Sequence, residues 1–380
     1  RQGGRGAVRI ETLTRDVVEP AVASRTIAER ESGNLGQGIS GVVSPQPDTC
    51  CLAGLQHGES FRSNIAVTAG ADSDVSATFI LYTGGAEPVA ESAEQIVPAG
   101  QQRQWSLEKL FPDYPVLTGP ARVSARLSSS AIVYVSIVDN ISTDGVTILG
   151  RVPQTSWIVP VVARAPGKND TYWTSDVAIA NVSPSYADLS LEYLPENTDN
   201  MDGGIVKDSI RLRPGQLVYF TDVVDDLFGV EEGKGTLRIE STAKIVASSR
   251  VSTPASGGGT IGHGVQAVTP AALNRETKVL SGVRLRQGFR SNVGVVTGEH
   301  PASVRLRLFD HDGVLQGETY VDVPGRSMAQ WSVDTLLGKA LLEKPDPAGG
   351  LVVDADTDFF AYLVTIDNSS QDPVMFLPEH

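Results

Sequence analysis

The tetrapeptide Phe61-Arg62-Ser63-Asn64 returns as Phe289-Arg290-Ser291-Asn292, and this repetition decides the fold. The two copies begin at positions 61 and 289, and each leads into a short apolar run. A second match follows in the same order, because Gln104-Trp105-Ser106 corresponds to Gln330-Trp331-Ser332. Ordered self-similarity of this kind indicates an internal structural repeat.

A third match has the same spacing as the first, since Val138-Asp139-Asn140 corresponds to Ile366-Asp367-Asn368. The midpoint between positions 61 and 289 is position 175, which predicts a middle copy there. In that copy residues 174–181 stand for the first strand, and Tyr219-Phe220-Thr221 stands where the other copies have Gln-Trp-Ser. The sequence therefore predicts an N-terminal arm that matches none of the copies, followed by three modules, at residues 1–50, 51–152, 156–270 and 277–380.

The apolar residues inside each module alternate with polar ones. Val75, Ala77, Phe79 and Leu81 show the period of two that is typical of a strand with one face in a core. Roughly seven short strands per module suit a two-layer β-sandwich of immunoglobulin-like size. The fold class is predicted to be all-β, with one short helical turn per module at residues 107–111, 223–228 and 333–337.

These motifs carry a resemblance. An aromatic-x-Ser/Thr-Asp/Asn strand, a Pro-Gly-aromatic segment and a strand ending near Val-Asp-Asn together resemble the immunoglobulin-like repeat modules of secreted and surface-attached bacterial proteins. The resemblance implies three tandem immunoglobulin-like β-sandwich domains behind an extended arm. It also implies an extracellular or cell-surface location after removal of a signal peptide. The shared motifs serve packing and turns, so no catalytic residue is carried over.

Composition limits the partners. Asp and Glu number 45 against 31 Lys and Arg, which gives a formal net charge of −14. This charge repels nucleic acid and anionic lipid. The apolar runs are much shorter than the roughly 20 residues of a membrane-spanning helix, so no membrane span is predicted. The short connectors at 153–155 and 271–276 predict a fairly rigid rod of modules.

Catalytic patterns are missing. The five histidines are scattered and form no His-Glu-x-x-His pair, and no Gly-x-Ser-x-Gly elbow occurs. Residues 257–262 satisfy the dinucleotide fingerprint letter by letter, but a strand at 265–268 follows instead of a helix. We therefore expect no enzymatic activity and no cofactor.

One stretch offers ligands of the kind that Ca²⁺ prefers. Asp354, Asp356 and Asp358 alternate along a predicted hairpin and form a weak calcium candidate. The glycine and distal glutamate of an EF-hand loop are absent, so a solvated turn is the stronger interpretation. Cys50 and Cys51 are adjacent and closer than the usual disulfide geometry requires. They are either a buried thiol pair or a covalent link to another chain.

The N-terminal arm allows two interpretations. Val8, Ile10 and Leu13 alternate with polar residues like a strand, while Val17 and Val18 precede a proline that a central strand would not tolerate. The arm either folds back to complete a sheet of its own module or adds a strand to a neighbouring subunit. The second arrangement gives a head-to-tail homopolymer. The inter-subunit candidates are Val8, Ile10, Leu13, Val17, Val18, Cys50 and Cys51.

Tandem sandwiches, short connectors and an unmatched arm together indicate a function. The leading hypothesis is a non-catalytic structural subunit of an extracellular or cell-surface fibre, sheath or surface layer, formed by self-association. The alternative is an adhesive or carbohydrate-binding accessory protein that acts as a monomer on a glycan or surface partner.

Overall fold

The fold is almost entirely β-structure, which confirms the predicted class. A computed structural model describes residues 8, 23–30, 33–40, 49–285, 288–337 and 348–378. In these residues the predicted helical turns are present as α1 (Leu107–Leu110), α2 (Val223–Asp226) and α3 (Val333–Leu337), and a 3₁₀ turn, η1, covers Pro270–Ala272. None of the described helices is long and apolar enough to cross a membrane.

Strands of residues 49–151, which we name module 1, form two facing sheets. One sheet has the order β11-β10-β4-β8, and the other has the order β3-β9-β5-β6 with β7 also paired to β5. Alternate residues of β5 are buried, as the period of two predicts, and they pack into one core. The strands are β3 (Thr49–Leu55), β4 (Phe61–Ala69), β5 (Val75–Tyr82), β6 (Ala90–Glu91), β7 (Gln95–Val97), β8 (Gln102–Ser106), β9 (Ala121–Leu127), β10 (Ala131–Asp139) and β11 (Gly145–Leu149).

Residues 278–377, named module 3, repeat this arrangement. Their sheets have the orders β23-β20-β25-β26 and β19-β24-β21-β22. The strand order β23-β20-β25-β26 corresponds to β8-β4-β10-β11 of module 1, as the sequence repeat requires. The strands are β19 (Lys278–Arg284), β20 (Phe289–Thr297), β21 (Ala302–Asp310), β22 (Leu315–Val323), β23 (Met328–Ser332), β24 (Ala348–Ala355), β25 (Phe359–Asp367) and β26 (Pro373–Phe376).

Residues 154–268, named module 2, form a single seven-stranded sheet. The 22-residue strand β17 runs through it and pairs with β12 and β14 by its first half and with β13 and β18 by its second half. One long strand thus belongs to both layers of the module. The strands are β12 (Gln154–Pro166), β13 (Tyr172–Asn181), β14 (Ala187–Pro195), β15 (Ile205–Leu212), β16 (Leu217–Phe220), β17 (Gly233–Pro254) and β18 (Thr260–Gln266).

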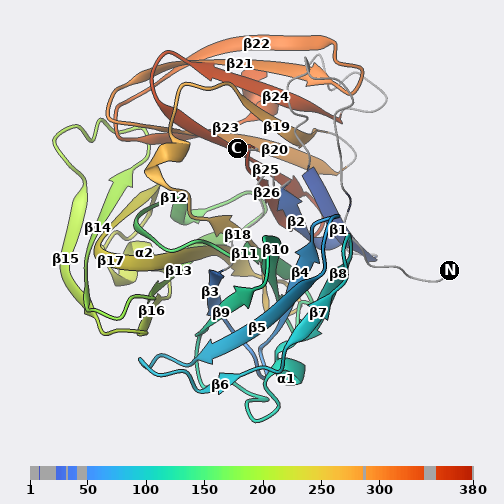
Figure 1. Ribbon diagram of the computed structural model, residues 1–380. Helices are drawn as coiled ribbons and strands as arrows, with labels where there is room; N and C mark the ends of the chain where they lie inside the picture. The colour runs from blue at the N-terminus through green and yellow to red at the C-terminus, as the bar shows by residue number, and fades with distance from the viewer. Residues whose placement is uncertain are drawn as a thin grey trace.

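The three modules lie around a common centre (Figure 1), so the predicted rod is wrong. At this centre β18 contacts β11 and β26. Every residue of β25 is buried, because one face packs inside module 3 and the other packs on module 2. A sheet with two apolar faces must be covered on both sides. The core of module 2 therefore continues into module 3.

The N-terminal segment contributes a hairpin to the same centre. Strands β1 (Ala23–Arg30) and β2 (Gly33–Ser40) pair antiparallel, and β2 contacts both β11 and β26. Residues 23–30 and 33–40 thus lie against their own chain, but they form a separate two-stranded sheet and pair with none of the described strands of module 1. Ile10, Leu13, Val17 and Val18 lie outside the described residues.

The prediction that this segment matches no module is wrong. Leu35-Gly36-Gln37-Gly38-Ile39 corresponds to Ile261-Gly262-His263-Gly264-Val265 of β18. Arg25 of β1 corresponds to Arg250 of β17, at nearly the same offset along the chain. The β1–β2 hairpin is therefore the counterpart of the last hairpin of module 2, although the sequence between the paired strands is shorter, at 31–32 against 255–259.

A substitution at Gly294 of β20 tests the packing between β20 and β25. It pairs with Tyr362, and a Cβ at position 294 would lie 2.0 Å from the buried Tyr362 ring. We expect Gly294→Ala to lower the free energy of unfolding by about 1–3 kcal/mol through overpacking, measured in urea. The control is Ala66→Gly at the same position of module 1, opposite Tyr134, with an expected cost of about 1 kcal/mol. Unchanged stability of Gly294→Ala would contradict this packing.

Candidate functional site

The turn after β10 holds a strand of module 2. Asp139 accepts hydrogen bonds from the backbone N–H of Thr260 at 2.8 Å and from its hydroxyl at 2.9 Å. The Ser142 hydroxyl donates to the Thr260 carbonyl at 2.6 Å. Further along the turn, Asp144 accepts from the N–H of Gly262 at 2.7 Å. We name this arrangement, in which two carboxylates bind alternate amides of β18, the first clamp.

The turn after β25 holds the N-terminal hairpin in the same way. Asp367 accepts from the backbone N–H of Asn34 at 3.2 Å, and the Ser370 hydroxyl donates to the Asn34 carbonyl at 2.6 Å. Asp372 accepts from the N–H of Gly36 at 2.8 Å. We name this arrangement the second clamp. Its carboxylates follow those of the first at the spacing of the sequence repeat, with position 367 matching 139 and position 372 matching 144.

Glycines and arginines complete both clamps. A Cβ at Gly262 would lie 2.2 Å from a carbonyl oxygen of β17, and one at Gly36 would lie 2.0 Å from a carbonyl oxygen of β1. Only glycine lets the clamped strand approach this closely. The guanidinium of Arg250 stacks over the Phe61 ring at 5.4 Å, and that of Arg25 stacks over Phe289 at 5.6 Å.

Hydrogen bonding keeps Asp139, the first aspartate of the first clamp, charged. Burial alone would raise the pKa of Asp139, but the amides of Ser142, Ile141 and Thr260 donate to it and lower the pKa below its usual value. Two of these donors belong to the turn itself. The turn therefore orients the carboxylate before the neighbouring strand binds.

Asp144 and Asp372, the second aspartates of the two clamps, lie close to one another at the centre of the three modules. Burial raises the pKa of Asp372 to about 9, with a further increase from the charge of Asp144, and burial raises the pKa of Asp144 to about 7. One oxygen of each, Oδ1, is buried and has no hydrogen-bond partner. These raised pKa values mean that the two carboxyls do not both carry a charge at neutral pH.

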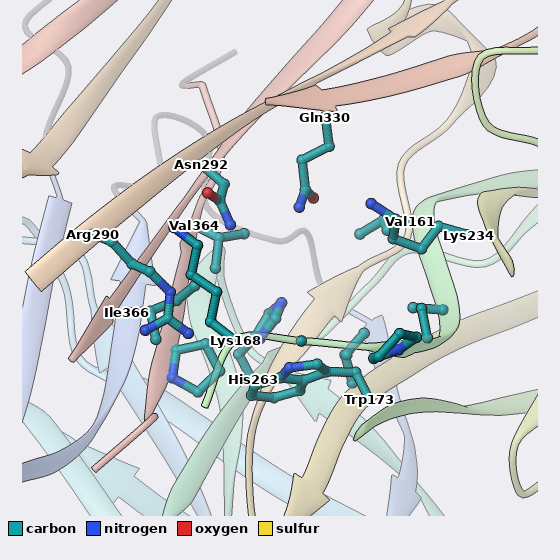
Figure 2. A pocket seen from close by; sticks show the side chains of 16 residues that line it. Val161, Lys168, Trp173, Lys234, His263, Arg290, Asn292, Gln330, Val364 and Ile366 are labelled. Atoms are coloured by element: carbon teal, nitrogen blue, oxygen red, sulfur yellow. The ribbon is translucent and has the colours of Figure 1, made fainter. Parts of the chain in front are cut away.

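A pocket of about 300 Å³ lies beside this centre, between modules 2 and 3. Figure 2 shows Asn292 and Gln330 of module 3 facing Trp173 and His263 of module 2. Apolar side chains form much of the wall between them. The other labelled lining residues are Val161, Lys168, Lys234, Arg290, Val364 and Ile366.

His263 presents unused hydrogen-bonding groups at this pocket. Both of its ring nitrogens are buried and have no partner. Burial, with a smaller contribution from the positive charge of Arg250, lowers the pKa of His263 to about 4. The ring is therefore neutral at pH 7 and offers one donor and one acceptor.

The counterpart of His263 shows why these nitrogens have no partner. Gln37 of β2 accepts hydrogen bonds from the hydroxyls of Ser136 and Thr147, both at 2.9 Å. The equivalent positions of module 3 are Val364, which lines the same pocket as His263, and Met375. Two hydroxyl donors are thus replaced by apolar side chains in module 3.

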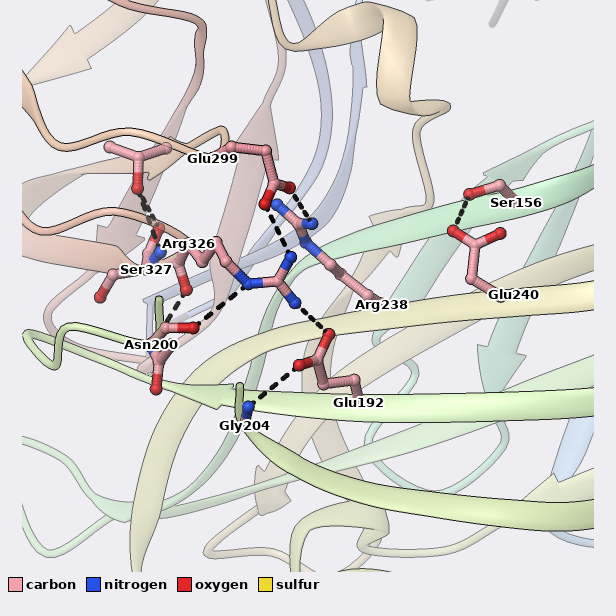
Figure 3. A network of polar contacts seen from close by, with 10 residues as sticks. Ser156, Glu192, Asn200, Gly204, Arg238, Glu240, Glu299, Arg326 and Ser327 are labelled. Carbon is pink, nitrogen blue, oxygen red and sulfur yellow. Dashed lines mark hydrogen bonds and ion pairs between the residues drawn. The ribbon is translucent and has the colours of Figure 1, made fainter. Parts of the chain in front are cut away.

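A network of ion pairs fixes modules 2 and 3 relative to one another (Figure 3). Arg326 of module 3 pairs with Glu192 at 2.6 Å and with Glu299 at 2.8 Å, and Arg238 of module 2 pairs with the same Glu299 at 2.6 Å. Asn200 donates from its side chain to the Arg326 carbonyl at 3.0 Å. The charges alternate across the boundary between the modules.

The predicted calcium ligands do not converge. Asp354 pairs with Arg307 at 2.7 Å, Asp356 accepts from the backbone N–H of Ser303 at 2.8 Å, and Asp358 lies 3.6 Å from Arg275. Among the described residues no group of three or more His, Cys, Asp or Glu side chains is placed to hold a metal ion. Each carboxylate instead has a separate partner.

The cysteines and Val8 differ sharply in exposure. Cys50 and Cys51 are free thiols of β3, and both are buried, so neither faces another subunit. Burial raises the pKa of both thiols well above the usual value. Val8 is 87% exposed, and the structure gives it no partner strand among the described residues.

The sequence contains a signal for the clamps beyond the motifs that define the repeat. The matched strands end in Asp139-Asn140 and Asp367-Asn368, and the pattern continues as Asp-Asn-x-Ser-x-Asp after Val138 and as Asp-Asn-Ser-Ser-Gln-Asp after Ile366. The second aspartate of each pattern repeats at the same spacing. The pattern alone does not identify the strand whose amides these aspartates bind.

Comparison with known proteins does not place the chain in a family. No family model matches it, and no curated protein matches it. It is similar to dimeric latent PorU from Porphyromonas gingivalis at 8% identity and a TM-score of 0.16, covering 88% of this chain and 34% of that chain. It is similar to trypsin-activated alpha-2-macroglobulin from Escherichia coli at 12% identity and a TM-score of 0.15, covering 94% and 26%. The chain spans well under half of either protein, and likeness at this level carries no argument about function.

The central carboxyl pair makes stability depend on pH. Asp144 and Asp372 hold protons in the folded chain that they release at about pH 4 when unfolded, so stability falls as pH rises from about 4 to about 9. We expect Asp144→Asn to flatten this fall, because Asn keeps an acceptor for Gly262 and removes one charge. Thermal unfolding at pH 5 and pH 9 measures the effect. Asp188→Asn, whose carboxylate is exposed, is the control. Equal pH slopes in Asp144→Asn and the parent would contradict the raised pKa values of this pair.

Proposed function

We propose that this chain is a non-catalytic structural subunit of an extracellular or cell-surface assembly. The observation that carries the proposal is the pair of clamps, whose buried aspartates hold a strand of module 2 on module 1 and the N-terminal hairpin on module 3. Hydrogen bonds from backbone amides to a carboxylate are among the stronger ones in proteins, about 1.5–3 kcal/mol each. A body locked in this way transmits force and keeps a fixed shape.

The use of the carboxylates supports the same proposal. The carboxylate oxygens of Asp139, Asp367 and Asp354 bind backbone amides, hydroxyls or an arginine of the chain itself. A catalytic acid or base needs an oxygen that can reach a substrate. These carboxylates are instead committed to holding strands and modules in place.

Electron microscopy of the purified chain tests this function together with the first clamp. We expect ordered fibres or sheets from the parent chain, and we expect Asp139→Ala to abolish them while lowering the free energy of unfolding by about 3 kcal/mol, because buried donors lose their acceptor. Asp188→Ala, whose carboxylate is exposed and pairs with Arg211, is the matched control. A chain that stays monomeric at high concentration would overturn the proposal.

The pocket favours a second candidate function, binding of an acidic carbohydrate. Lys168, Lys234 and Arg290 line it, with Lys234 already paired to Glu196 at 3.1 Å, and Trp173 offers an aromatic face of the kind on which sugar rings pack. These features fit a uronic acid unit better than a neutral sugar.

Binding of oligogalacturonate tests the second candidate. We expect Trp173→Ala to weaken binding by at least tenfold and Lys168→Gln to weaken it several-fold, as measured by calorimetry. Lys207→Gln on β15, away from the pocket, serves as the control and leaves binding unchanged. Equal affinity of Trp173→Ala and the parent chain, or no binding by the parent, would remove this function.

A further inference from the structure

One edge of the N-terminal hairpin is open. β1 pairs with β2 from Ala23↔Ser40 to Arg30↔Gly33, and no other strand within the described ranges pairs with it. The corresponding strands of the modules have partners on both sides, because β10 lies between β4 and β11, β25 between β20 and β26, and the end of β17 between β13 and β18. Ile27 of β1 is 45% exposed, whereas β25 is buried throughout.

Arg25 of this hairpin carries donors that lack an acceptor. Its side chain is only 12% exposed, and Nη2 donates to Asp372 at 2.8 Å. Nε and Nη1 are buried and have no hydrogen-bond partner. Leaving charged N–H groups buried and unpaired costs free energy. The open edge therefore lies beside a buried cation with two unused donors.

The counterpart of Arg25 shows which group belongs there. Arg250 of β17 stands directly opposite Asp176 of β13 in the antiparallel register. Burial raises the pKa of Asp176, and the charge of Arg250 opposes that rise. In module 2 the strand that pairs with the hairpin thus places a carboxylate in register with the arginine, while the carboxylate oxygens accept hydrogen bonds from the Tyr219 hydroxyl and the Asp222 amide.

A second surface, on β19 of module 3, is partly exposed. Cys51 and Ala53 of β3 are buried under Ala178 and Ala180 of β13. Val279 and Ser281 of β19 occupy the equivalent positions in module 3, and both are only partly buried. The face that β13 covers on module 1 is only partly covered at Val279 on module 3.

We propose that the edge of β1 and the adjoining face of β19 form a docking surface for the opening strands of one more module of this repeat. The strand that pairs with β1 resembles β13 and places an acidic side chain opposite Arg25. Backbone hydrogen bonds along the edge supply affinity, and the charge pair together with the apolar contacts on Val279 sets the register. This inference is independent of the proposed structural role.

A grafted chain tests the docking surface. Residues 6–11 match residues 235–240 in sequence, so a second copy of residues 154–234 joined ahead of Gly6 offers the strands in the correct order. We expect the amides of residues 23–30 to exchange hydrogen at least tenfold more slowly in the grafted chain than in the parent. Unchanged exchange at these residues overturns the proposal.

The matched control changes one residue of the grafted copy. Asp176→Arg in that copy alone sets an arginine against Arg25, and we expect it to remove the protection of residues 23–30. Equal protection with and without this change overturns the assignment of an acid opposite Arg25. The original Asp176 of module 2 stays as it is in both chains.

A peptide in solution gives a second measurement that does not depend on folding of the graft. A synthetic peptide of residues 171–182 is titrated into the unmodified chain, with the Asp176→Arg peptide as control. We expect saturable binding that protects residues 23–30 and is at least fivefold weaker for the control. No protection by either the graft or the peptide overturns the docking surface, whatever the assembly state of the chain.

Discussion

Carboxylates buried in a turn and bonded to the backbone of another module are the interaction on which the arrangement depends. Removing a charge from water is costly unless hydrogen bonds replace the lost solvent. Asp139 and Asp367 meet this condition in two stages, first through amides of their own turn and then through the neighbouring strand. Because the turn prepares the acceptor, the neighbouring strand needs only to bring its N–H groups to the right spacing.

The compact arrangement follows from what each sheet must cover. β25 is apolar on both faces, and one face packs under the core of module 2. Short connectors alone are compatible with a rod, which is what the sequence led us to expect. The burial of a second face decides against it, since an exposed sheet of this composition would leave a large apolar surface in water.

Local structure was predictable where one short pattern determines it. The alternation from Val75 to Leu81 predicts β5, and the apolar spacing after Trp105 predicts α1. The calcium candidate failed because alternate aspartates of a hairpin face different neighbours, with Asp354 bound to Arg307 and Asp356 to a backbone amide. Such partners come from distant strands and leave no mark in the local sequence.

Relations between modules were the least accessible part. The aspartates of both clamps stand in a repeated pattern, yet their partners, Thr260 and Asn34, are far away in the chain and differ in residue type. The pocket shows the same limit, since Trp173 and Gln330 meet only after modules 2 and 3 have packed. A repeat in the sequence identifies equivalent positions, but it does not say which copies touch.

The pair Gln37 and His263 shows what an internal duplication makes available. In one copy the Gln37 side-chain amide accepts hydrogen bonds from two hydroxyls, which fix its position in the packing. The other copy, His263, lies against apolar side chains and makes no such hydrogen bonds. A protein that carries the same scaffold twice can therefore vary one copy toward recognition while the other continues to hold the architecture.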